Sequence, residues 1–209
     1  MRKSLNFLPA EKRRDLRQLV QIIHEEVSDV VMVILYGSYA RGTYVDYDQR
    51  IEYGVKTYFM SDYDLLIVTQ KRMGINEHAV YAKILRRFFE NKAWEIHTHP
   101  QFINESISEL NKALDKSRYF YTDIKKEGVM LYDSGKYKLA RRRKLDYTEI
   151  AEMAQEYFDN TFSRASQFLT TATFTLSKDW LNMTSFNLHQ AAENFLRTIP
   201  LTFILYGYK

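Results

Sequence analysis

Two stretches of this chain, residues 46–48 and 62–64, both read Asp-Tyr-Asp and have the spacing for metal chemistry. Alternation along a strand puts two such carboxylates on one face, where they repel each other unless a cation lies between them. Mg²⁺ is held by oxygen ligands, commonly one or two carboxylates together with substrate phosphates. Asp62 and Asp64 lead directly into the apolar run 65–68, whereas the first triplet continues into a polar, turn-like stretch. Asp62 and Asp64 are therefore better candidates for metal ligands than Asp46 and Asp48, but the pair alone is equally compatible with a strand start that satisfies a turn or a helix N-cap.

A Gly-Ser step follows the preceding apolar run, within the sequence YGSYARG of residues 36–42. Gly37 lets the backbone turn and approach a ligand closely, and free N–H groups beyond it can receive a phosphate. Ser38 adds a hydroxyl donor, and Arg41 adds a guanidinium that fits phosphate oxygens. If the two strands are antiparallel neighbours, the end of one lies beside the start of the other. The phosphate-binding turn and the carboxylates would then form one nucleotide–metal site.

Helix and strand signals alternate in the first half of the chain, which must position these residues. Short β-branched or alternating runs predict strands, and 3.6-residue periodicity predicts helices that start after Pro9, near residue 76 and after Pro100. Residues 44–60, rich in Tyr and Asp, could be a hairpin or a flexible excursion. We expect an α+β fold with a small mixed sheet flanked by helices, and strands at residues 29–36, 64–70, 93–99 and 129–134.

Strand signals stop after residue 147, and two helical patterns follow, the second from about residue 178. They predict a C-terminal helical hairpin with one apolar face, which is too little to close a core alone. The expected domains are 1–133 with an insertion at about 44–60, a basic linker at 134–146, and a helical segment at 147–209. We expect the apolar tail to pack on the first domain or in a homodimer.

Composition excludes several classes of site. The chain has no cysteine, so disulfides, thiolate zinc sites and cysteine nucleophiles are ruled out and a reducing compartment is expected. The charged N-terminus is unlike a signal peptide, and the apolar runs are shorter than the ~20 residues of a membrane helix. We expect a cytoplasmic protein without a membrane partner. The net charge of +4 fits an ordinary solvated surface or attraction to a polyanion.

The combination of LYGSYARG with SDYDLLIV resembles the DNA polymerase beta-like nucleotidyltransferases, and most of all their minimal members, over roughly residues 15–133. Residues 39–61 form a longer connection than is usual in that family, and the surplus is the Tyr/Asp-rich stretch. The resemblance implies transfer of a nucleotidyl group, AMP being expected, from an NTP such as ATP to an acceptor hydroxyl. It also implies Mg²⁺ or Mn²⁺ as the cofactor and Gly37 and Ser38 as nucleotide-binding residues, to which we add Arg41 because its guanidinium fits phosphate oxygens.

The family also has a third carboxylate on a later strand, for which Glu95 is the best match although aspartate is usual there. The resemblance thus implies catalytic and metal-binding roles for Asp62, Asp64 and Glu95. His97 and His99 share a face with Glu95 in the expected strand and could add to the site or act as a base, although such histidines are more often inert.

The sequence FNLHQAAENFLRTI, residues 186–199, resembles the helical HEPN domain, and the segment looks truncated at its end. The acceptor stays open between a protein tyrosine, as in antitoxins paired with HEPN toxins, a small hydroxylated molecule and RNA. The alternative function is a non-catalytic module that binds nucleotide or RNA. A Glu95 that completes the triad favours the enzyme, and a Glu95 that points away favours the module.

Overall fold

A computed structural model describes residues 1–52, 54–90, 97–141 and 143–205 of the 209-residue chain. The chain divides into two compact units, Met1–Arg143 and Lys144–Lys209, which we call the sheet unit and the helical unit. Within the described ranges, no helix has the length and apolar character needed to cross a membrane.

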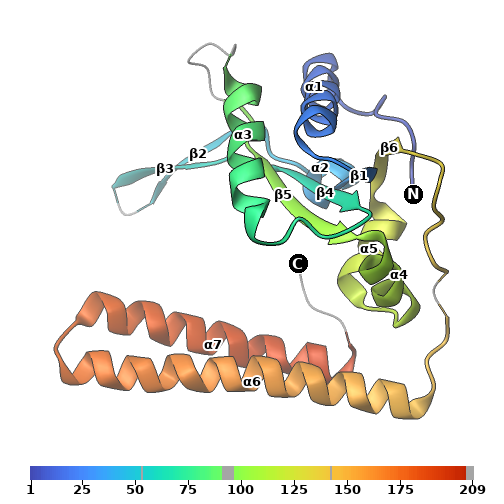
Figure 1. The fold of residues 1–209 in the computed structure, drawn as a ribbon. Helices are drawn as coiled ribbons and strands as arrows, with labels where there is room; N and C mark the ends of the chain where they lie inside the picture. Colours follow the sequence, from blue (N-terminus) through green and yellow to red (C-terminus); the bar gives the residue numbers. More distant parts are fainter. Residues whose placement is uncertain (53, 91–96, 142, 206–209) are drawn as a thin grey trace. The chain divides into compact units, whose positions relative to one another are not determined.

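A four-stranded mixed sheet lies at the centre of the sheet unit (Figure 1). Its order is β5-β4-β1-β6, in which β1 is antiparallel to β4 and β6, while β4 and β5 are parallel. The two central strands are apolar and buried along most of their length because both faces of the sheet are covered. The strands are β1 (Val30–Tyr36), β4 (Tyr63–Thr69), β5 (Pro100–Ser106) and β6 (Val129–Asp133).

Helices cover both faces of the sheet because side chains alternate along the strands. Leu65 and Ile67 face a core formed with α1 (Ala10–Glu26) and α3 (Glu77–Phe89). Leu66 and Val68 face the opposite core, where the packing partners come from α4 (Ile107–Asp115) and α5 (Tyr119–Glu127). The short helix α2 (Gly37–Arg41) directly follows β1, and the short helix η1 (Gly74–Asn76) directly precedes α3. The predicted α+β class, with a mixed sheet and flanking helices, is confirmed.

The prediction of a helix directly after Pro100 is wrong, because residues 100–106 form β5. Phe102 packs in one core and Ile103 in the other, which is the alternation of a strand. The helix begins only at Ile107, where the Ser106 side chain accepts the N–H of Glu109 at 3.2 Å. Residues 93–96 of the strand predicted at 93–99 lie outside the described residues, and residues 97–99 have no regular secondary structure.

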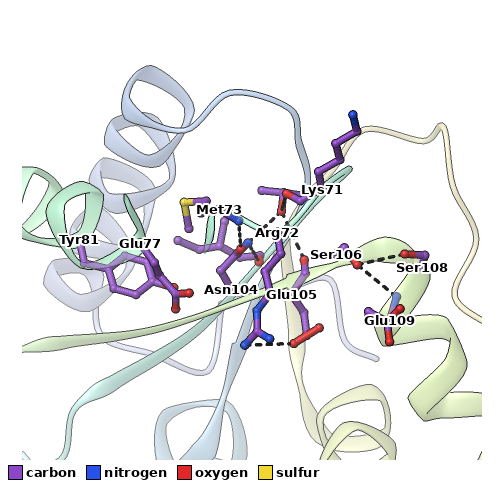
Figure 2. Close-up of polar contacts among 12 residues, drawn as sticks. Lys71, Arg72, Met73, Glu77, Tyr81, Asn104, Glu105, Ser106, Ser108 and Glu109 are labelled. Atoms are coloured by element: carbon purple, nitrogen blue, oxygen red, sulfur yellow. Dashed lines mark hydrogen bonds and ion pairs between the residues drawn. The ribbon is translucent and has the colours of Figure 1, made fainter. Parts of the chain in front are cut away.

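A polar cluster at the C-terminal ends of β4 and β5 holds these strands in register (Figure 2). The fully buried Asn104 donates its amide N–H to the Ile67 carbonyl at 2.9 Å and accepts the Met73 N–H at 2.8 Å. Beside it, an Arg72 guanidinium nitrogen lies 3.5 Å from a carboxylate oxygen of the buried Glu105. These contacts help to set which β5 residue lies beside the aspartate pair at the other end of β4.

Residues 44–60 contain a hairpin of two strands, β2 (Asp48–Glu52) and β3 (Val55–Phe59), which form a separate antiparallel sheet. Figure 1 shows this hairpin, which we call the β2–β3 arm, extending away from the four-stranded sheet. Its base is closed by the Ser61 N–H, which bonds to the Val45 carbonyl at 2.9 Å, and by the Val45 N–H, which bonds to the Ser61 hydroxyl at 3.0 Å. The arm is therefore a hairpin anchored directly before Asp62.

The helical unit consists of α6 (Tyr147–Ser177) and α7 (Leu181–Phe203), which confirms the predicted C-terminal helical hairpin. Small and polar residues line the seam between the two helices, including hydroxyl pairs Thr161–Thr198 at 2.9 Å and Thr175–Thr184 at 3.0 Å. Many larger apolar side chains are exposed instead, among them Phe158, Phe162, Leu169, Leu176, Leu181, Leu188, Leu196 and Ile199. The seam thus buries mostly small and polar residues, together with Met153 and Leu201, and the unit keeps many apolar side chains on its exterior.

Candidate functional site

The two sequence motifs meet at one end of the sheet. Because β1 and β4 are antiparallel, Tyr36 at the end of β1 pairs with Asp64 near the start of β4. Gly37 follows with a φ of +70°, and a Cβ atom at this position would lie 2.0 Å from an Asp64 carboxylate oxygen. A side chain at residue 37 would therefore be strained and would also displace the carboxylate. The glycine turn and the second aspartate triplet therefore lie side by side, as the sequence analysis expected if these two strands were antiparallel neighbours.

The Asp64 carboxylate lies in an environment that disfavours its negative charge. The pKa of Asp64 is raised to about 6, chiefly by burial and also by the charge of Asp62, while the charge of Arg41 opposes the shift. Two half-buried carboxylates that repel each other gain most from a cation between them. These two carboxylates, beside the glycine turn at residue 37, fit the ligand preference of a divalent cation.

Arg41 and Ser38 lie in α2, next to the carboxylates. A guanidinium nitrogen of Arg41 is 3.7 Å from a Glu127 carboxylate oxygen, which is a loose ion pair, and both side chains are partly exposed. The Ser38 carbonyl accepts the Thr43 N–H at 3.0 Å, which closes the turn after the helix. The structure thus places Gly37, Ser38 and Arg41 within one turn that borders Asp64.

Glu95, the predicted third carboxylate, lies outside the described residues. On β5 the residue that pairs with Asp64 is Gln101, so an exposed amide occupies that position. His97 and His99 both lie beside the Phe89 ring, with ring centroids 6.5 and 5.7 Å away. In the part of the chain that the structure describes, no group of three or more His, Cys, Asp or Glu residues could hold a metal ion.

A supporting network that the sequence analysis did not identify joins α1 to both sides of the site. The Lys12 ammonium donates to the Thr98 hydroxyl at 3.0 Å and pairs with an Asp46 carboxylate oxygen at 3.0 Å. The fully buried Tyr39, in α2, shares a hydrogen bond with Thr98 at 3.1 Å. The network ties α2 and the segment before β5 to the base of the arm. No local signal marks Lys12, since its partners are distant in sequence.

Tyr36 is a second residue beside the site, next to Asp64, that the sequence analysis did not identify. Its ring packs edge-on against Phe120, with the ring centroids 5.7 Å apart. Its hydroxyl lies near enough to Asp64 for the carboxylate charge to disfavour ionisation of the hydroxyl. Burial raises the pKa of Tyr36 above its ordinary value, and the Asp64 and Tyr121 charges add to the effect. Tyr36 therefore stays a neutral hydroxyl beside the carboxylate. Its position directly before Gly37 was the available signal.

No protein-family model matches the chain, and no curated protein matches it. Among solved structures, a Sulfolobus solfataricus protein that carries the name of a nucleotidyltransferase is 20% identical, with a TM-score of 0.34. That match covers 60% of this chain and 86% of the other. A toxin–antitoxin structure with AMP-PNP is 11% identical with a TM-score of 0.33, and covers 57% of this chain and 73% of that one.

Proposed function

We propose that the protein is a metal-dependent nucleotidyltransferase, which moves a nucleotidyl group from an NTP to an acceptor hydroxyl while pyrophosphate leaves. AMP from ATP is the expected group. The observation that carries the proposal is the contact between Gly37 and Asp64, because it brings a turn able to approach a phosphate against a carboxylate that lacks a full counter-charge.

The residues have separate roles in this proposal. Asp62 and Asp64 would hold Mg²⁺ or Mn²⁺, and Gly37 with Ser38 would receive the triphosphate. Arg41 would offset phosphate charge, for which its loose pair with Glu127 leaves it available. A bound divalent cation supplies charge stabilisation at the phosphate that is transferred. Glu95 would add the third carboxylate, as the family resemblance implies.

Calorimetry and a transfer assay test the proposal together. Titration with ATP should release heat when Mg²⁺ or Mn²⁺ is present and should release none in excess EDTA. Incubation with labelled NTPs, alone and with candidate proteins, RNAs and aminoglycosides, should transfer the label to one acceptor class. Nucleotide binding that is equally strong in EDTA would contradict the metal site.

The alternative is a regulatory module that binds nucleotide or RNA without turnover, and one observation favours it. The position that pairs with Asp64 on β5 is Gln101, whose amide lacks the charge to hold a second metal ion. Pyrophosphate release separates the two functions, because a module would bind Mg²⁺-ATP and release none with any acceptor. Glu95→Gln should then leave the module unaffected but should impair an enzyme.

The helical unit is proposed to act as a HEPN-like partner segment, with the protein as a homodimer related to toxin–antitoxin systems. Its exposed apolar side chains support a packing role. Removal of residues 147–209 should change the oligomeric state or cause aggregation in light scattering. A truncated protein of unchanged oligomeric state that stays soluble would contradict this assignment.

A further inference from the structure

The β2–β3 arm exposes large apolar side chains on both of its faces. Tyr47, Ile51 and Tyr58 lie on one face, and Val55 and Phe59 on the other, each with between 46% and 69% of its surface exposed. The arm is also a sheet of only two strands, so each strand has an outer edge that no strand of the described chain pairs with. A hairpin of this kind is marginally stable in water unless something packs or pairs with it.

The charges of the arm argue against a nucleic acid as the missing partner. Residues 44–60 contain three acidic and two basic residues. One of the two cations, Arg50, already pairs with Asp48 through a contact of 2.7 Å. Polyanion binding depends on uncompensated Lys and Arg side chains. A polypeptide edge fits these strands better, since it supplies backbone partners and apolar side chains without demanding charge.

We propose that the partner is a second copy of this chain, and that the β3 edges of the two copies pair antiparallel around a two-fold axis at Thr57. The two arms would then form one four-stranded sheet with the order β2-β3-β3-β2. An isologous contact of this kind uses the same residues on both sides, so the edge must be complementary to itself.

The sequence of β3 meets that requirement. With Thr57 opposite its own copy, Lys56 lies opposite Tyr58, and Val55 lies opposite Phe59. Each cross-strand pair is favourable, because Thr–Thr, aromatic–cation and aromatic–β-branched pairs all stabilise antiparallel strands. The equivalent symmetric register on β2 would set Arg50 opposite its own copy, and like charges directly opposite destabilise a sheet.

The backbone alternation of the hairpin agrees with this register. A turn closed on the Glu52–Val55 pair directs the N–H and C=O groups of Val55, Thr57 and Phe59 toward β2. Lys56 and Tyr58 then direct theirs outward, and they are the residues that face each other across the proposed axis. The two copies of Thr57 then form a non-hydrogen-bonded pair, in which their Cα atoms are about 4.5 Å apart.

Cysteine trapping tests the register directly, because the chain has no cysteine of its own. Thr57→Cys should form an intermolecular disulfide under mild oxidation, since disulfides need Cα atoms about 4.4–6.8 Å apart. Gln49→Cys, which is also an exposed position but lies on β2, is the matched control. Rapid dimer formation by Thr57→Cys alone, on non-reducing gels of the full chain, supports the proposal. Equal trapping of both variants, or of neither, overturns it.

A charge substitution gives a second readout without oxidation. Thr57→Glu places a carboxylate opposite Arg50 within its own hairpin, which favours the arm, but opposite a second glutamate across the axis. Light scattering over a concentration series should show at least a tenfold weaker self-association than in the unmodified chain. Gln49→Glu makes the same charge change on β2 and should leave the association constant unchanged. Equal effects of the two substitutions would contradict pairing through β3.

Discussion

The two Asp-Tyr-Asp triplets share their local sequence but lie in opposite electrostatic settings. In the first, Asp46 pairs with Lys12 at 3.0 Å and Asp48 pairs with Arg50 at 2.7 Å, so each carboxylate has a close cation. In the second, the nearby cation Arg41 only partly offsets the effects of burial and of the Asp62 charge on Asp64. Charge compensation marks a structural role, whereas a repelling pair beside a glycine turn favours ligand binding.

The first prediction sets one triplet against the other and has the largest expected effect. Asp64→Asn keeps the side chain's size but removes a negative charge and a metal ligand, so nucleotidyl transfer should fall roughly 10³-fold or more. Asp48→Asn should cost about tenfold at most, because Asp48 lies in the arm and pairs with Arg50. A transfer assay on both variants, with folding checked by circular dichroism, measures the difference. Equal losses would show that the second triplet is not the site.

The glycine turn allows a sharper comparison. Gly37→Ala should lower activity about 10²-fold, because the new Cβ would lie 2.0 Å from an Asp64 oxygen and displace the carboxylate. Gly74→Ala is the matched control, since Gly74 also has a positive φ, of +64°, but has no atom within 4 Å of the added Cβ. Both variants carry backbone strain, and only one disturbs the carboxylate. Similar activities for the two would refute the proposed role of the contact.

Stability should depend on pH through Asp64. The folded state favours the protonated form of Asp64, so ionisation of this carboxyl lowers the stability of the fold. The whole of this cost is present above the pKa of about 6. This cost disappears as the pH falls toward the ordinary value of 3.8. Asp64→Asn removes this cost, so it should raise the free energy of unfolding at pH 8 by about 1 kcal/mol after solvent screening. For a chain of this size, that corresponds to a melting temperature higher by about 2–4 °C.

Thermal melts at pH 8 and pH 4.5, without divalent cations, measure that difference. The advantage of Asp64→Asn should be clear at pH 8 and mostly lost at pH 4.5. Mg²⁺ with ATP at pH 8 should stabilise the unmodified chain and not the variant. A melting difference that is the same at both pH values would contradict the environment assigned to Asp64.

The smallest expected effect is the loss of protein stability caused by Asp48→Asn in the first triplet. Asp48→Asn breaks an exposed ion pair with Arg50, and such pairs contribute about 0.2–1 kcal/mol. The melting temperature should therefore fall by about 3 °C at most, and less in high salt because the charges are screened. Melts in low and high salt test this, and a large loss that persists in high salt would assign Asp48 a role beyond the ion pair.

Much of the fold follows from local patterns. The apolar runs of β1 and β4, the amphipathic periodicity of α3 and the two long C-terminal helices were predictable, because their residue types and periods agree with the observed structure. The strand β5 was not, since Phe102, Ile103 and Ile107 also fit a helical period. Pairing with β4 and the cap at Ser106 decided in favour of a strand.

The site was predictable only in part. The pairing of the Gly-Ser turn with the second aspartate triplet followed from the condition that the strands are antiparallel neighbours, and that condition holds. The support from Lys12 and Thr98 could not be predicted, because neither residue belongs to a motif. Gln101 opposite Asp64 depends on the β4–β5 register, which no local pattern specifies.

The sequence by itself determined which side chains could do chemistry and in which kinds of element they lie. Residue type sets the available ligands and donors, and the hydrophobic period sets helix or strand. Asp48 has its cation, Arg50, only two residues away, but only the tertiary structure decided that Asp46 is neutralised and that Asp64 is not, because a carboxylate responds to charges a few ångströms away in space. For the same reason Lys12, in the first helix, compensates Asp46, while Asp62 and Asp64 are left to repel each other beside Gly37.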